Sequence, residues 1–183
     1  VPMGGAERGG VVRVYDDYGH HPTEIETTLR ALREHDRPEE RGGRLICVFQ
    51  PHQHSRTRFF MEEFASAFGQ ADVVVVPEIY FVRDSEQERT RVSAGDLVEK
   101  LRDRGVRAMH LHPFGAIVEQ LENLCRPGDL LVVMGAGPVW RIARDYMSNA
   151  STGRAPGGTK ATVARTPDGR AGTGPVGGGG ASG

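Results

Sequence analysis

Residues 16–23 (DDYGHHPT) bring two carboxylates, a phenol and two imidazoles into eight consecutive positions. An apolar run precedes them and a helical pattern follows, so we expect a loop that leads into a helix. The N-terminus of a helix favours anions and phosphates, because its first N–H groups are unpaired and its dipole is positive there. The alternative is that Asp17 caps a turn and that His20 and His21 only fill space. Zinc is disfavoured, since adjacent histidines point in different directions and no third ligand stands nearby in the sequence.

Residues 50–58 (QPHQHSRTR) form a second segment of this kind and add histidines and arginines. Arg56 and Arg58 stand at the expected start of a helix, where positive charge is unfavourable against the helix dipole. This unfavourable placement suggests an anionic partner, a carboxylate or a phosphate held by a guanidinium group. Two solvated surface arginines are the alternative.

Residues 135–140 (GAGPVW) follow the last apolar run of the chain and form the third segment. Glycines at the end of a strand allow the backbone to approach a ligand or a neighbouring helix closely. The segment lacks the third glycine of a dinucleotide-binding fingerprint, and no acidic residue follows about 20 positions on, so tight packing is an equal alternative. His110 and His112 follow another apolar run, and we interpret them as ordinary loop histidines.

Short apolar runs and helical patterns alternate around these segments. The apolar runs predict strands at residues 11–15, 45–49, 72–76, 107–111 and 129–134, with residues 79–82 as an extension or an additional short strand. The helical patterns predict helices from residue 23 and over residues 56–68, 93–104, 114–125 and 138–147. The alternation is typical of an α/β, Rossmann-like fold with a mostly parallel, five- to six-stranded sheet and helices on both faces. Ligands bind such sheets at the carboxyl ends of the strands, where all three segments lie.

Length and composition indicate one folded domain and exclude several classes of protein. Of the 183 residues, positions 148–183 contain no Leu, Ile, Phe, Tyr, Trp or Met but 11 of the 25 glycines, which predicts a disordered Gly/Pro/Thr-rich tail. A formal net charge of −1 gives no electrostatic footprint for nucleic acid. We find no apolar run long enough for a membrane span and no secretory signal. Cys47 and Cys125 suit buried thiols in a protein of the reducing cytoplasm.

Three motifs together resemble the carboxyl-terminal domain of the Mur ligases. They are DDYGHHPTE (residues 16–24), FQPHxxSRTR (residues 49–58) and GDxxxxMGAG (residues 128–137), in the order expected for the family. On this resemblance residues 10–147 are the Mur ligase domain, and residues 1–9 are a remnant of an interdomain linker. Within the family, the pattern is most similar to the members that join L-alanine to UDP-N-acetylmuramate.

The resemblance implies an ATP-dependent acid–amino-acid ligase of peptidoglycan-precursor synthesis with three domains. In this family the first domain binds the UDP-sugar, and the central domain carries a phosphate loop and Mg²⁺ ligands. The third domain has a Rossmann-like fold and closes over ATP and the incoming amino acid. ATP phosphorylates the muramoyl carboxylate, and the amine of L-alanine attacks the acyl phosphate.

The resemblance also implies roles for individual residues. The side chains expected around the amino acid are those of Tyr18, His20, His52 and Arg56. Arg56 would pair with the carboxylate of L-alanine, which suits a small zwitterion that needs a fixed cation. Asp17 and His20 are the expected catalytic residues. The residues expected to face the nucleotide are Asp17, Gly135 and Gly137.

The sequence departs from the family pattern in two ways. Gln53 and His54 stand where the family usually has Arg and Tyr, so one of two carboxylate-binding cations is expected to be missing. No GxxxxGK[ST] segment occurs, so we expect this chain alone to bind neither ATP nor Mg²⁺ nor any other metal, and to form no acyl phosphate. Its partners would be the missing N-terminal and central ligase domains. The alternative is a stand-alone nucleotide- or amino-acid-binding module without catalysis. A hydrolase with a histidine base is disfavoured, because no GxSxG elbow occurs.

Overall fold

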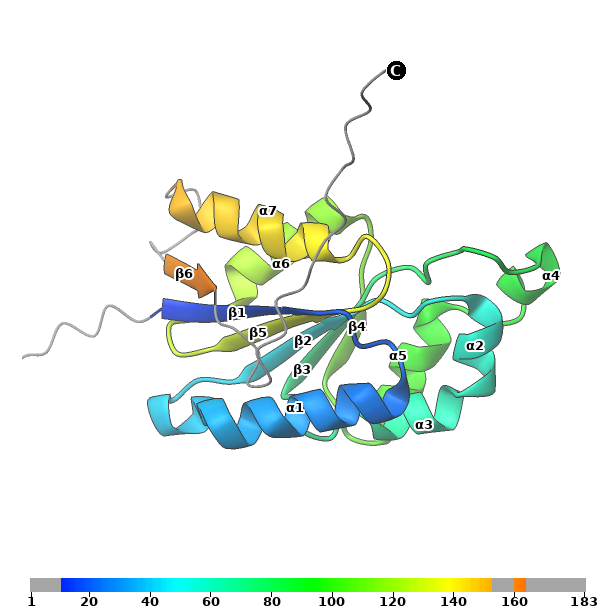
Figure 1. Ribbon diagram of the computed structural model, residues 1–183, viewed down its shortest axis with the longest axis horizontal. Coiled ribbons are helices and arrows are strands. Elements are labelled where there is room, and N and C mark those ends of the chain that lie inside the picture. Colours follow the sequence, from blue (N-terminus) through cyan, green and yellow to red (C-terminus); the bar gives the residue numbers. More distant parts are fainter. Residues whose placement is uncertain (1–10, 153–159, 164–183) are drawn as a thin grey trace, which may run out of the picture.

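The computed structural model describes residues 11–152 and 160–163 (Figure 1). The expected linker remnant at residues 1–9 lies outside these residues, and so does most of the expected tail. Among the described residues, no helix has the length and apolar composition needed to cross a membrane.

Six parallel strands form one sheet in the order β4-β3-β2-β5-β1-β6. The strands are β1 (Val11–Asp17), β2 (Leu45–Phe49), β3 (Val73–Val76), β4 (Ala108–His110), β5 (Leu130–Met134) and β6 (Lys160–Val163). The three central strands β2, β3 and β5 are buried at every position, which explains why their sequences are continuous apolar runs. The predicted mostly parallel α/β fold is therefore confirmed.

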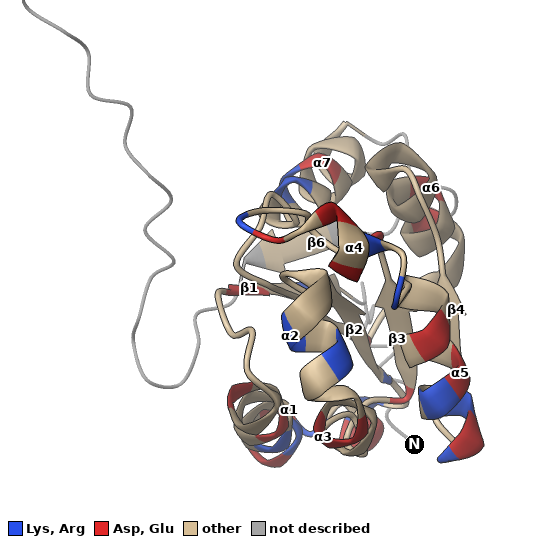
Figure 2. Ribbon diagram, turned by 90° about the vertical axis from the view of Figure 1, so that its right-hand side faces the viewer, with Lys and Arg blue, Asp and Glu red and all other residues tan. Residues whose placement is uncertain are grey.

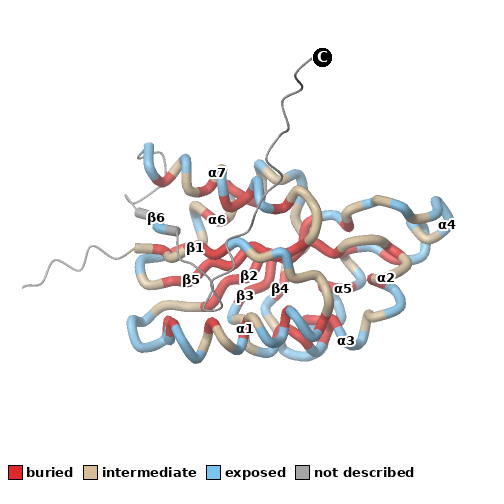
Figure 3. The backbone as a smooth tube through the Cα atoms, viewed as in Figure 1, coloured by how far each residue is buried: buried red, intermediate tan, exposed pale blue. Residues whose placement is uncertain are grey.

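Helices cover both faces of the sheet (Figure 1). They are α1 (Pro22–Asp36), α2 (His54–Phe59), α3 (Met61–Ser66), α4 (Glu86–Arg89), α5 (Ala94–Asp103), α6 (Phe114–Leu124) and α7 (Trp140–Ser151), with a short 3₁₀ helix at Pro38–Arg41. Leu45, Cys47 and Phe49 of β2 share one buried cluster with α1, α3 and α5. Ile46 and Val48 share the other cluster with α6 and α7. Figure 3 shows this burial concentrated on the sheet and on the inner helix faces.

Both cysteines are free and buried, as the sequence predicted. Cys47 lies in β2, and Cys125 follows α6 directly. Burial raises the pKa of Cys125 to about 12, so its thiol stays protonated and unreactive at neutral pH.

Two local predictions differ from the structure. The single helix predicted over residues 56–68 is two short helices, α2 and α3, separated at Phe60, whose φ of −101° and ψ of 22° leave the helical range. Residues 79–82 form no strand, and this segment contributes only an isolated parallel bridge between Tyr80 and His52. The bridge nevertheless places Tyr80 beside the second chemistry-bearing loop.

Regular structure continues past Met147, where the sequence predicted a disordered tail. Helix α7 extends to Ser151, and Lys160–Val163 form β6, which pairs in parallel with β1 from Val11 to Val14. The prediction of disorder is wrong for these two segments, because helical hydrogen bonds in α7 and the pairing of β6 with β1 satisfy backbone groups without requiring large apolar side chains. Residues 153–159 and 164–183 of the expected tail lie outside the described part of the chain.

Candidate functional site

The three chemistry-bearing loops meet because their strands are neighbours. β5 lies between β1 and β2, and all three run in parallel, so the loops that follow them emerge side by side. The Gly135 N–H donates to the Asp17 carbonyl at 3.1 Å, and the Gln50 N–H donates to the Met134 carbonyl at 3.0 Å. Figure 2 views the molecule from this end, with α2 and its basic residues in front of the sheet. The topology thus creates one candidate site at the carboxyl edge.

The glycines of the third loop are required for packing between the loops. Gly135 has a φ of +144°, and a Cβ built there would lie 2.8 Å from the Gln50 carbonyl oxygen. A Cβ on Gly137 would lie 2.8 Å from Gln50 Oε1 and 3.0 Å from the Tyr80 ring. The tight packing that the sequence left open therefore explains both glycines, and their expected contact with a nucleotide remains a prediction.

Asp17 ends β1 and holds the first loop in shape. Its Oδ1 accepts a hydrogen bond from the Gly19 N–H at 2.7 Å, and its Oδ2 accepts one from the Thr28 hydroxyl at 3.2 Å. These two contacts make Asp17 the cap of the turn, as the alternative interpretation expected. Neither bond tests the expected catalytic or nucleotide-facing role of Asp17.

The adjacent histidines His20 and His21 have different environments. His21 is the N-cap of α1, where its Nδ1 accepts from the Thr23 N–H at 3.3 Å. Glu24 completes this capping box, and the N–H groups of His20 and His21 lower the pKa of its carboxyl. Because capping occupies His21, His20 is the imidazole of this loop that remains for a ligand.

His20 faces the second loop. Its ring centroid lies 6.1 Å from that of His52 and 5.7 Å from that of Tyr18, whose side chain is 68% exposed. The His52 ring in turn lies 5.7 Å from the ring of Tyr80. The structure therefore brings together three of the four residues expected around the amino acid, with Tyr80 as an additional neighbour.

Several buried polar atoms at this junction have no hydrogen-bond partner among the described residues. They are Gln50 Oε1, His52 Nδ1 and Arg56 Nε, with His54 Nδ1 nearby in sequence. Burying such atoms without a partner is unfavourable, so a native structure that keeps them commonly reserves them for a ligand or water. Burial, followed by the charges of His20, Arg56 and Arg83, lowers the pKa of His52 and favours its neutral ring.

Arg56 and Arg58, for which the sequence predicts the same kind of anionic partner, differ in their contacts. Arg58 donates to Glu88 of α4 through Nε at 2.8 Å and Nη2 at 3.1 Å. This pairing within the chain satisfies Arg58, so the predicted need for an anionic ligand does not apply to it. Arg56 keeps its unpaired Nε and is the better candidate for binding an anion.

Gln53 and His54, the two departures from the family pattern, have structural roles. Gln53 adopts a φ of 66°, and its Nε2 donates to the carbonyls of Val82 and Arg83 at 3.2 and 3.3 Å. His54 is buried against Phe81, with ring centroids 5.8 Å apart, and burial lowers the pKa of its imidazole. Neither side chain supplies the second cation that the family pattern places here.

Gln50 and Tyr80 belong to the site, but the sequence interpretation did not select them. Gln50 stands inside the second segment, where a neutral amide gives a weaker sign of chemistry than the histidines and arginines around it. Tyr80 lies in a segment that was read as a strand. Only its bridge to His52 and its closeness to Gly137 reveal its position, and neither follows from residue type.

Comparison with known proteins agrees with this arrangement of motifs and strands. Residues 4–137 match the family profile described as "Mur ligase, glutamate ligase domain". The chain belongs to the Mur ligase family. The matched range contains the three Mur ligase motifs that form the candidate site, so the resemblance drawn from them is confirmed.

Curated relatives of this Mur ligase domain are named UDP-N-acetylmuramate–L-alanine ligase. One from Acetivibrio thermocellus is 39% identical over 138 residues, which cover 75% of this chain and 28% of that protein. Another, from Agathobacter rectalis, is 42% identical over 152 residues and covers 79% of this chain and 32% of the relative. The chain thus spans less than a third of the length of these relatives.

Solved Mur ligases share the fold. A UDP-N-acetylmuramate–alanine ligase from Thermotoga maritima superposes with a TM-score of 0.52 at 22% identity, over 76% of this chain and 27% of that one. A murein peptide ligase from Psychrobacter arcticus gives a TM-score of 0.52 at 19% identity, over 78% of this chain and 29% of that one. At these identities the comparison supports the Mur ligase fold and not the role of any residue.

Proposed function

We propose that this chain is the amino-acid-binding and ATP-closing domain of a cytoplasmic ligase that joins L-alanine to UDP-N-acetylmuramate. The names of the curated relatives support the reaction. The observation that carries the proposal for this site is that the segment after β2 holds an unpaired Arg56 Nε, a desolvated His52 and an unpaired Gln50 Oε1. A small zwitterion requires a cationic donor for its carboxylate and acceptors for its ammonium group, and these three side chains supply both.

Each end of L-alanine has a partner in this set. The guanidinium of Arg56 pairs with the carboxylate, because its planar array of donors matches two carboxylate oxygens. The amine faces acceptors, which Gln50 Oε1 and a neutral imidazole provide. Since burial lowers the pKa of His52, its ring is suited to accept a hydrogen bond from the ammonium group. His20 and the exposed Tyr18 close the outer side of the site.

The amine must lose a proton before it attacks an acyl phosphate, and we assign this step to the histidine pair. The nitrogen of the protonated amine has three N–H bonds and one bond to carbon and therefore no free electron pair, so a base within hydrogen-bond reach is needed. His20 lies with its ring centroid 6.1 Å from that of His52, which allows a proton to pass toward solvent from one imidazole to the other through a water. Asp17 fixes the backbone turn that leads to His20.

Arg83 is our candidate for the cation that Gln53 does not provide. The Gln53 side chain bonds to the Arg83 carbonyl at 3.3 Å, and the charge of Arg83 contributes to the lowered pKa of His52. Its φ of 49° shows that the loop holds this residue in an uncommon backbone conformation. The proposal is that Arg83 and Arg56 together compensate the negative charge of the amino-acid carboxylate.

ATP and Mg²⁺ are assigned mainly to the rest of the ligase. Within residues 11–152 and 160–163, one group of three acidic or histidine side chains is arranged to hold a metal, and it lies at the ends of β3 and β4 rather than in the three loops. The sequence also has no GxxxxGK[ST] segment. We therefore propose that this domain contributes Asp17 and the glycine loop to the edge of the ATP site and takes no part in holding Mg²⁺.

Binding of L-alanine, followed by NMR, tests the proposal. We expect millimolar L-alanine to shift backbone resonances of residues 16–23 and 50–58 in the wild-type chain. Arg56→Gln is expected to weaken this binding at least tenfold, because a charged hydrogen bond contributes about 1.5–3 kcal/mol. Arg58→Gln is the matched control, since Glu88 already pairs with that arginine.

The two variants separate the proposal from its alternatives. Equal losses of L-alanine binding in Arg56→Gln and Arg58→Gln would show that general positive charge, not the Arg56 site, attracts the amino acid. Shifts confined to other parts of the domain would contradict the site itself. Muramate-dependent turnover of ATP by the purified chain would contradict the assignment of acyl-phosphate formation to other domains.

A further inference from the structure

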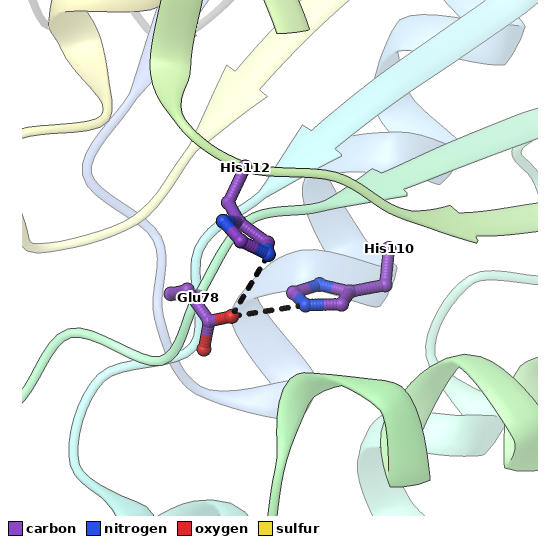
Figure 4. Close-up of side chains that lie close together, drawn as sticks. All are labelled: Glu78, His110 and His112. Atoms are coloured by element: carbon purple, nitrogen blue, oxygen red, sulfur yellow. Dashed lines mark hydrogen bonds and ion pairs between the residues drawn. The ribbon is translucent and has the colours of Figure 1, made fainter. Parts of the chain in front are cut away.

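A second cluster of potential ligands lies at the edge of the sheet away from the candidate site. Glu78 follows β3, while His110 ends β4 and His112 stands two residues later. β3 and β4 are parallel, with Val76 opposite His110. Glu78 and His112 each lie two residues beyond this pair, in the loops that follow the two neighbouring strands. The ends of β3 and β4 therefore bring the three side chains together (Figure 4).

The ligand atoms of the cluster are close enough to share one ion. Glu78 Oε1 lies 3.0 Å from His110 Nε2 and 3.8 Å from His112 Nε2. One ligand atom from each residue falls within 4.8 Å of the others. Bonds of about 2.0–2.1 Å at tetrahedral angles place two ligand atoms about 3.3 Å apart. The two observed separations lie below and above this value, so small side-chain rotations would bring the ligand atoms to the spacing that a bound ion requires.

His110 is oriented for coordination. Its Nδ1 lies 2.9 Å from the Val76 carbonyl oxygen, which can only accept, so Nδ1 must carry the proton. In the neutral ring the lone pair is then on Nε2, and Nε2 faces Glu78 Oε1, another acceptor. One acceptor therefore lies on each side of this imidazole. A proton or a metal ion must stand between Nε2 and the carboxylate. A carbonyl that fixes the ring in this way is the usual outer support of a metal-bound histidine.

We propose that Glu78, His110 and His112 form a binding site for a divalent transition-metal ion of the zinc class. Two imidazoles and one carboxylate are a ligand set that Zn²⁺ prefers, whereas Mg²⁺ prefers oxygen ligands throughout. Glu78 and His112 are largely exposed, so an ion can enter from solvent and keep a water as its fourth ligand. A shallow cavity lined by Pro77, Glu78, His112 and Pro113 opens beside the cluster.

The metal site is separate from the amino-acid site but connected to it through one residue. The Glu78 carbonyl accepts a hydrogen bond from Gln50 Nε2 at 3.0 Å. This bond directs Gln50 Oε1, the unpaired acceptor of the amino-acid site, away from Glu78. An ion that ties Glu78 to β4 therefore also restrains the residue that holds Gln50 in place.

The test is a titration of the metal-free 183-residue chain with ZnCl₂, followed by calorimetry and by the ¹⁵N shifts of the histidine rings. We expect one Zn²⁺ per chain with micromolar affinity, with the Nε2 signals of His110 and His112 moving on binding. Glu78→Gln, which keeps the shape of the side chain, and His112→Ala are each expected to lower the affinity by more than the about 10- to 100-fold that loss of an outer partner causes. His35→Ala removes an exposed histidine of α1 and is the matched control.

Three outcomes would overturn the proposal. They are no binding below millimolar Zn²⁺, unchanged affinity in a His110→Ala/His112→Ala double variant, and ring shifts at His20 and His52 in place of His110 and His112. Circular dichroism of each variant confirms that it is folded, and the exposed position of His112 makes a folding defect in its alanine variant unexpected. None of these outcomes depends on L-alanine binding, so the metal site and the proposed function are tested independently.

Discussion

Replacing Gly135 by alanine should destabilise the domain strongly. The residue has a φ of +144°, which L-residues rarely adopt, and an added Cβ would lie 2.8 Å from the Gln50 carbonyl oxygen. The backbone strain costs about 1–3 kcal/mol, and the overpacking costs about 1–3 kcal/mol more. The combined loss of about 2–6 kcal/mol is a large part of the about 5–15 kcal/mol that stabilises an ordinary domain.

Urea unfolding followed by circular dichroism measures this loss as a lower midpoint with an unchanged slope. Gly115→Ala in α6 is the matched control, because a Cβ there meets no atom within 4 Å. Its free energy of unfolding should stay the same or rise by up to about 1 kcal/mol. If Gly135→Ala does not fold, Gly137→Ala offers a milder version, since its closest contact is the end of the Gln50 side chain. A change below about 0.5 kcal/mol in Gly135→Ala would refute the argument that the loops need glycine to pack.

Two further predictions concern stability. Burial lowers the pKa of His52 and of His54 below the ordinary value of 6.5, so the unfolded chain binds more protons there than the folded one. The free energy of unfolding should therefore fall as the pH decreases from 7.5 through 6.5 toward the lowered pKa values of these histidines in the folded chain. His52→Gln should weaken this dependence of stability on pH, whereas His35→Gln should leave it unchanged. Arg44→Ala should lower the free energy of unfolding in urea by about 2 kcal/mol, because it removes two side-chain donors from the buried carboxylate of Asp129. The backbone N–H groups of Arg44 and Arg126 stay bound to that carboxylate. Arg37→Ala, at an exposed ion pair with Glu40, is the control and should change stability by less than about 1 kcal/mol. Equal effects of the two alanine variants would contradict the importance of burial.

The sequence predicted the central strands well because burial on both faces makes them continuous apolar runs. LICVF and LLVVM were identified to the residue or within one residue of β2 and β5. The break at Phe60 was missed, because residues on both sides of it continue the same apolar periodicity. The pairing of β6 was also missed, since its stability comes from backbone bonds to β1 rather than from its side chains.

The sequence predicted where the candidate site lies but not which partner each of its side chains has. Residue types placed histidines and arginines after neighbouring strands, and this much follows from the alternation of elements. That Glu88 pairs with Arg58 and leaves Arg56 free depends on a contact between segments 30 residues apart. The capping role of His21 had a visible signal, a Glu three positions later, which the sequence interpretation did not use. The sequence predicts His110 and His112 to be ordinary loop histidines, because Glu78 joins them only through the pairing of β3 with β4 just before it.

Strand β6 has a consequence for how the chain behaves in solution. β1 pairs with β5 on one side and with β6 on the other, so β6 covers what would otherwise be an open row of N–H and C=O groups. Exposed rows of this kind join to strands of other molecules and promote aggregation. A truncation after Ser151 would keep all three loops and the zinc-class cluster. It would also leave β1 as an exposed edge strand that can pair with other molecules. The four residues of β6 thus replace the seven-residue strand β1 as the edge of the sheet, and a shorter edge strand offers fewer free backbone groups for self-association.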